Sequence, residues 1–101
     1  MIDAIDTGVS GRASRKIGLK LKSLSKETQV ITVTHSAQIA SVADEHYLIQ
    51  KDFNKNKTYT KVTLLDFEGR KNELARIMGG LQITDSLLNS AEELLLLQED
   101  I

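Results

Sequence analysis

The sequence predicts an α/β fold, with a partial parallel sheet, a β-hairpin and flanking helices, in a single domain over residues 1–101. The run QVITVT at residues 29–34 is β-branched and nearly continuous in apolar character, which is typical of a strand buried on both faces of a parallel sheet. Residues 46–51 and 58–65 read as two strands around the polar turn Asn54–Lys57, which predicts a hairpin. The segments between these runs have helical periodicity.

The first elements are a strand end, a loop and a helix. Residues 1–5 are apolar apart from Asp3 and indicate the last part of a strand, and residues 6–11 form a polar loop that contains glycine. A helix of about 15 residues is expected to follow, with Ser10 as its N-cap. Its apolar side should carry Ala13, Ile17, Leu21 and Leu24.

Two helices flank the hairpin in the sequence. A longer helix is expected from about Asp66 to Met78, ended by the pair Gly79–Gly80. Before the hairpin, Ser36 can cap a short helix that runs through Asp44. The residues of this short helix that should face inward are Ile39, Ala40 and Ala43.

The last helix should begin after Thr84 as its N-cap, with Ile83 and Leu88 placed as a hydrophobic staple. Leu96 and Leu97 widen its apolar stripe beyond what one helix face needs. The stripe itself consists of Leu87, Leu88, Ala91, Leu94 and Leu95.

Composition excludes several classes of function. The net charge of -1 argues against binding nucleic acid over the whole surface. The chain contains no cysteine, which excludes disulfides and Cys-based zinc sites. It has no apolar stretch long enough to cross a membrane and no signal peptide, so we expect a cytoplasmic protein.

Two polar residues follow predicted strands closely enough to be candidates for chemistry. Asp3 lies at the end of an apolar strand, where open α/β sheets place metal-binding carboxylates; the alternative is an acid in a solvated turn. His35 follows the run at 29–34, where a histidine can reach a phosphate oxygen; the alternative is a hydrogen-bonded surface histidine. Parallel strands joined by a helix end at the same sheet edge, so Asp3 and His35 could line one phosphate site.

Three segments together resemble the RecN family of DNA-repair ATPases, whose heads are of the ABC/SMC type. Residues 3–12, DAIDTGVSGR, are similar to the family's Walker B end and D-loop, which read D-E-(I/V)-D-T-G-V-S-G. Residues 33–40, VTHSAQIA, with Ala43-Asp44 and His46–Ile49, resemble V-T-H-L-P-Q-(V/I)-A and A-D-x-H-Y-L-I. Residues 73–80, ELARIMGG, resemble E-(L/I)-A-R-M-(L/I)-(G/A)-G. The resemblance implies the C-terminal lobe of a P-loop ATPase head.

The resemblance also implies roles for individual residues. Asp3 matches the Walker B aspartate that helps to hold Mg²⁺, often through water. His35 matches the histidine that senses the γ-phosphate of ATP. The D-loop, which crosses the dimer interface when two heads close on ATP, matches Asp6, Thr7, Gly8, Val9 and Ser10.

The sequence also departs from the family pattern. Ala4 stands where the family has the catalytic glutamate, and a methyl group cannot orient or deprotonate water. Ser36-Ala37 replace Leu-Pro, and the strand before Asp3 is reduced to two residues. The 101 residues contain no G-x-x-x-x-G-K-[ST] loop, no signature motif and no coiled coil. We therefore expect this fragment alone to be inactive and to bind ATP and Mg²⁺ weakly.

In its full-length parent, the chain would form part of an ATP-hydrolysing SMC-like head that acts in DNA double-strand break repair and recombination. The implied partners are the N-terminal half of the head, a second head in a homodimer, and DNA through the full-length protein, in the bacterial cytoplasm at the nucleoid. The alternative is a non-enzymatic interaction module or gene remnant that self-associates through its leucine-rich surface. The basic helix over residues 12–26 is either a solvated face or a contact for DNA or an acidic partner.

Overall fold

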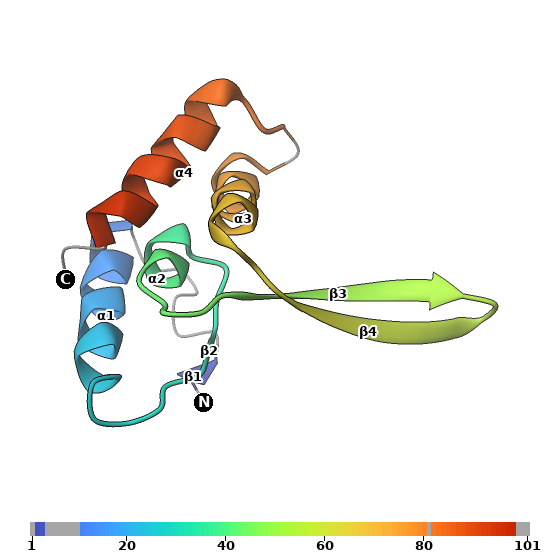
Figure 1. Ribbon diagram of the computed structural model, residues 1–101, viewed down its shortest axis with the longest axis horizontal. Helices are drawn as coiled ribbons and strands as arrows, with labels where there is room; N and C mark the ends of the chain where they lie inside the picture. The colour runs from blue at the N-terminus through green and yellow to red at the C-terminus, as the bar shows by residue number, and fades with distance from the viewer. Residues whose placement is uncertain (1, 4–10, 81, 99–101) are drawn as a thin grey trace.

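The structure is a computed structural model that describes residues 2–3, 11–80 and 82–98, the first two by their backbone alone. Figure 1 shows the helices gathered at one end and a hairpin that extends away from them. The α/β architecture expected from the sequence is confirmed. In chain order the elements are β1 (Ile2–Asp3), α1 (Gly11–Leu24), β2 (Thr32–Val33), α2 (Ala37–Ser41), β3 (Tyr47–Asn54), β4 (Lys57–Leu64), α3 (Phe67–Gly79) and α4 (Asp85–Gln98).

Side chains at the helix ends satisfy backbone groups that the helices leave unpaired. Ser36 caps α2 as expected, because its Oγ accepts a hydrogen bond from the Ile39 N–H at 3.3 Å. Thr84 caps α4 in the same way, accepting from the Leu87 N–H at 3.1 Å. Helix α3 begins after Asp66 and ends at Gly80, whose φ of 70° favours glycine. The starts of these three helices were therefore predictable from capping residues.

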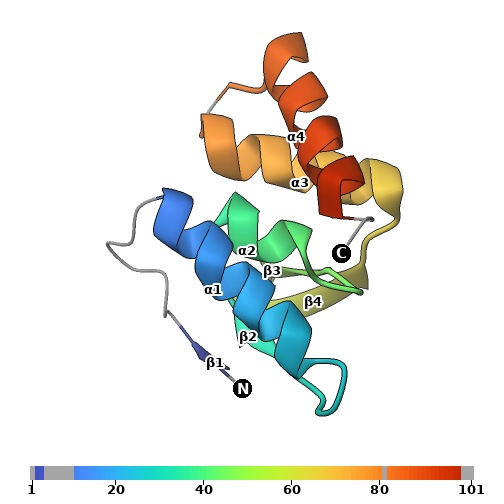
Figure 2. The ribbon, with the colours of Figure 1, turned by 90° about the vertical axis from the view of Figure 1, so that its left-hand side faces the viewer.

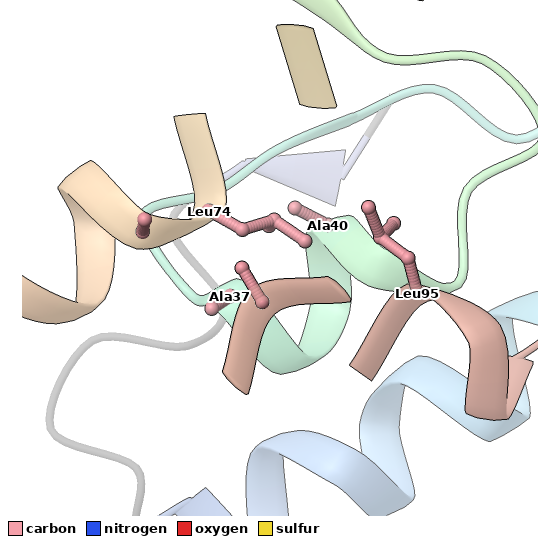
Figure 3. Packing of buried hydrophobic residues seen from close by; sticks show 6 residues of the cluster. Ala37, Ala40, Leu74 and Leu95 are labelled. Carbon is pink, nitrogen blue, oxygen red and sulfur yellow. The ribbon is translucent and has the colours of Figure 1, made fainter. Parts of the chain in front are cut away.

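The core lies where α2, α3 and α4 meet, and small residues let these helices approach closely (Figure 3). Leu74 is fully buried and is the largest such side chain among the described residues. Around it pack Ala37 and Ala40 from α2, and Ala91 and Leu95 from α4. The expected stripe of α4 is confirmed, because its other leucines, Leu87, Leu88 and Leu94, pack against this cluster.

Helix α1 packs on the opposite side of α2 (Figure 2). Its buried line runs through Ser14, Gly18 and Leu21, so the expected face is displaced, and Leu24 is exposed. The cause is the close approach at Gly18, where an added Cβ would lie 3.4 Å from the Gln38 carbonyl oxygen and from Val42 Cγ2. Helices that pack this closely bury their small residues.

Two expectations about the middle of the chain were wrong. The run at residues 29–34 forms a strand only at Thr32–Val33, and Ile31 and Val33 are exposed. Among the described elements β2 contacts only β1, so no described helix packs on either of its faces. Helix α2 ends at Ser41 rather than Asp44, with Val42 as its C-cap.

The strands of the hairpin extend further toward its tip than the sequence predicted. Strands β3 and β4 pair in antiparallel register from Tyr47–Leu64 at the base to Asn54–Lys57 at the tip. The two residues of the turn have positive φ, 48° at Lys55 and 67° at Asn56. That backbone matches the twist of the flanking strands, and asparagine tolerates it better than most residues.

Neighbouring leucines of α4 should differ sharply in what they contribute to stability. Leu95 is 4% exposed in the core, whereas Leu96 is 48% exposed. Leu95→Ala should lower the free energy of unfolding by about 2–5 kcal/mol, because it removes packed atoms and leaves a cavity. Leu96→Ala should change it by about 0.5 kcal/mol or less. Urea unfolding of both variants measures the difference, and equal losses would contradict this packing of α4.

Candidate functional site at the edge of the parallel strands

The two short parallel strands end at the same edge. Strand β1 pairs with β2 in the register Ile2–Thr32 and Asp3–Val33. His35 follows β2 by two residues and is exposed to solvent. The backbone positions of residues 3 and 35 are therefore brought toward one edge, as the predicted topology requires.

Most of the predicted site lies outside the described residues. This applies to Ala4 and to the D-loop positions Asp6, Thr7, Gly8, Val9 and Ser10. Asp3 is described only by its backbone. The structure therefore fixes the strand that leads into this segment, and the roles of its side chains stay predictions.

Hydroxyl groups shape the turn that carries His35. The Ser36 N–H donates to Thr34 Oγ1 at 3.0 Å, and Ser36 Oγ then accepts from the Ile39 N–H. His35 thus lies between two residues whose side chains bond to the local backbone. The capping role of Ser36 was predictable from the sequence, whereas the bond to Thr34 was not, because a Ser/Thr turn has the same local signal as any strand end.

Arg70 of α3 holds the far end of α2. Its Nη2 donates to the backbone carbonyls of Ala40, Ser41 and Ala43, at 3.3, 3.4 and 2.9 Å. These carbonyls lie at or just beyond the end of a short helix, and the Ala40 carbonyl also accepts from the Ala43 N–H at 3.3 Å. Burial lowers the pKa of Arg70, and the nearby Asp44 partly offsets that shift. The contact of Arg70 with α2 was not predictable from the sequence, because no local pattern links residues about 30 positions apart.

A cavity of about 240 Å³ lies beside this contact and is separate from the predicted site. Lys22 and Asp44 form an ion pair in its wall, and Arg70 and Gln98 also line it. The Gln98 amide is buried, and its nitrogen and oxygen have no hydrogen-bond partner among the described residues. An ordered water molecule would suit such a polar space.

The basic residues of α1 are divided between two environments. Lys22 forms the ion pair with Asp44. Arg12, Lys16 and Lys20 are exposed and follow each other at intervals of four, so they form one line on the helix surface. Such a line of charges suits both a solvated helix face and a contact for DNA or an acidic partner.

The described part of the chain offers neither a metal-binding cluster nor a membrane span. No group of three or more His, Cys, Asp or Glu side chains in it is arranged to hold a metal ion. Within the same residues, no helix combines the length and the apolar character needed to cross a bilayer.

His46 lies just before β3, within electrostatic range of Arg70 and Glu73 in α3. Burial lowers the pKa of His46, the Arg70 charge lowers it further, and Glu73 opposes both effects. The His46 Nδ1 atom is buried and finds no hydrogen-bond partner in the described part of the chain. Glu73 is itself buried and bonded to the Arg76 guanidinium, whose Nε lies 3.1 and 3.0 Å from its carboxylate oxygens. Burial and the Arg70 charge therefore favour the neutral form of the His46 side chain.

Stability should fall as the solution is acidified through the titration of His46. Its pKa in the folded chain is below the ordinary value of 6.5, so the unfolded chain binds the proton more readily. The contribution of His46 to stability is complete above pH 6.5 and is lost as the pH falls toward the folded pKa. Urea unfolding at pH 7.5 and pH 5.5 should show a smaller acid loss for His46→Gln than for the unchanged chain. An identical loss in both would contradict the burial of His46.

Comparison with known proteins finds relatives of this chain in several bacteria. No family model matches the chain. The chain is 45% identical over 95 residues to the DNA repair protein RecN of Rickettsia prowazekii, and the matched residues make up 94% of this chain. The corresponding identities are 41% over 96 residues for RecN of Vibrio cholerae and 37% over 95 residues for RecN of Bacillus subtilis.

These matches cover only a small part of each relative. The chain spans 17% of the length of the Rickettsia prowazekii and Vibrio cholerae proteins and 16% of the Bacillus subtilis protein. Similarity at this level over nearly the whole chain, in distantly related bacteria, agrees with the resemblance noted in the sequence. The chain belongs with RecN and corresponds to the C-terminal part of that protein.

Proposed function

We propose that this chain acts as part of an ATP-hydrolysing, SMC-like head in the repair of DNA double-strand breaks and in recombination. The observation that carries the proposal is the parallel pairing of β1 with β2, which brings the positions of Asp3 and His35 to one sheet edge. Its biological setting rests on the relatives, which are DNA repair proteins. The setting would be the bacterial cytoplasm, at the nucleoid.

The residues at this edge suit part of a nucleotide site. A carboxylate at position 3 can hold Mg²⁺ through water, and His35 is exposed at the end of β2, where it can donate to a phosphate oxygen. Bound Mg²⁺ would neutralise phosphate charge. The 101 residues contain no Gly-rich loop with a lysine, so the cradle for the phosphates would come from the N-terminal half of the head.

The segment over residues 6–10 would take part in assembly. As a D-loop it would contact a second head when two heads close on ATP, and DNA would be bound by the full-length protein. Ala4 cannot orient or deprotonate water, so this form would hold ATP and stay dimerised for longer than one with a glutamate there.

A non-enzymatic role is the second candidate. Leu96 and Leu97 are exposed on α4 and offer an apolar surface for self-association. A chain that dimerises with rising concentration, and gains no ATP binding when mixed with the N-terminal half of the head, would favour an interaction module.

Restoring a carboxylate at position 4 should raise hydrolysis in a complete head. We would replace the matching segment of the Rickettsia prowazekii RecN with this chain and measure single-turnover ATP hydrolysis. Ala4→Glu should increase the rate by a factor of up to about 10²–10⁴, with little change in ATP affinity. Equal rates with and without Ala4→Glu would refute the assignment of position 4.

His35→Ala should slow hydrolysis in the same hybrid protein without lowering its melting temperature, because the side chain is exposed.

A further inference from the structure

The two faces of the β3–β4 hairpin differ in chemistry. Side chains alternate across a strand, so the register assigns each cross-strand pair to one face. One face carries the pairs Tyr47–Leu64, Ile49–Val62, Lys51–Thr60 and Phe53–Thr58. The other carries Leu48–Thr63, Gln50–Lys61, Asp52–Tyr59 and Asn54–Lys57. The first set is called the apolar face below, and the second the polar face.

The apolar face is uncovered. Its five large apolar side chains are all at least half exposed, with Ile49 at 59%, Val62 at 58% and Phe53 at 81%. Among the described elements the hairpin strands contact only each other, and neither has a further strand beside it. Figure 1 shows the hairpin extending clear of the helices. A two-stranded hairpin is marginally stable in water, and an apolar surface of this kind usually marks a contact.

A second copy of the chain fits this face poorly. Lys51 lies near its centre, and the eight residues of the face include no Asp or Glu. Two apolar faces stacked on one another would bring two ammonium groups into an apolar contact without a carboxylate from either face. Burying unpaired charges in this way is costly.

The remainder of a RecN-type polypeptide fits better. The match to RecN of Rickettsia prowazekii covers 94% of this chain and so includes the hairpin, yet it is only 17% of that protein. Most of the relative therefore lies outside the matched segment and is linked to the hairpin covalently. Such linkage gives a high effective concentration, which favours an internal contact over one between molecules.

We infer that the apolar face of the β3–β4 hairpin docks on an apolar surface of the rest of the RecN-type polypeptide, with an acidic residue there opposite Lys51. The acid is required because the ammonium group would otherwise be enclosed without a partner. The inference deepens the proposed function by naming the surface through which this part joins the rest of the head. It rests on the RecN relationship and is independent of ATP hydrolysis.

Hydrogen exchange of the backbone amides tests the inference. The isolated chain is compared with full-length Rickettsia prowazekii RecN carrying this chain in place of its matching segment. Amides of β3 and β4 should exchange about 100-fold or more slowly in the full-length protein than in the isolated chain. Unaltered Rickettsia prowazekii RecN is measured over the stretch that matches Tyr47–Leu64, so a hybrid that fails to fold still leaves a result.

Paired variants identify the face that docks. Ile49→Thr with Val62→Thr changes a pair on the apolar face and keeps β-branched side chains. Gln50→Thr with Lys61→Thr is the matched control on the polar face, one pair further along. The first variant should lose most of the protection in the full-length protein, and the control should keep it.

Three results would overturn the inference: equally fast exchange in the isolated and full-length proteins, protection in the isolated chain that rises with its concentration, and equal loss in the two paired variants. The second would indicate a second copy as the occupant. Failure of the proposed ATPase is a separate result, because exchange is measured without nucleotide. A protected hairpin in a hybrid that hydrolyses no ATP even with Ala4→Glu would keep this inference and remove the proposed function.

Discussion

The contact between Arg70 and the end of α2 is the interaction on which the arrangement of this chain depends. Helix α2 has five residues, too few to be stable by itself, and its last carbonyls lie inside the protein. The Arg70 guanidinium donates to three of them and so fixes α2 to α3. All three bonds come from the terminal Nη2 atom of the Arg70 side chain.

Helix α2 transmits this constraint to both sides of the molecule. One side contributes Ala37 and Ala40 to the core with α3 and α4, and the other lies against α1 at Gly18. The turn with His35 leads directly into α2, and the Ser36 hydroxyl joins the two. The turn that carries His35 is therefore joined to a helical core that itself contains none of the predicted site residues.

Much of this fold could be predicted, because its signals are local. The caps at Ser36 and Thr84, the end of α3 at Gly80 and the hairpin each depend on residues close together in sequence. The errors concern contacts between distant parts of the chain. The extent and burial of β2 depend on what lies against it, and the buried face of α1 depends on the approach of α2 at Gly18.

In the candidate site, too, the local features were predictable and the contacts between distant residues were not. A strand followed by a polar residue is a local pattern, so the positions of Asp3 and His35 at strand ends were predictable, and their shared edge followed from parallel topology. Arg70 and its carbonyl partners were not, because the guanidinium reaches residues about 30 positions away. The same holds for the burial of His46, whose charged neighbours Arg70 and Glu73 lie more than 20 positions away in the sequence.

The pairing of β1 with β2 is the feature that the functional proposal needs most, and it can be measured directly. In nuclear Overhauser spectra of the isotopically labelled chain, we expect backbone contacts from Ile2 to Thr32 and from Asp3 to Val33, in parallel register. Their observation would place the segment after Asp3 and the turn at His35 at one edge. Antiparallel contacts, or none between these strands, would contradict the shared edge and with it a nucleotide site built from residues 3 and 35.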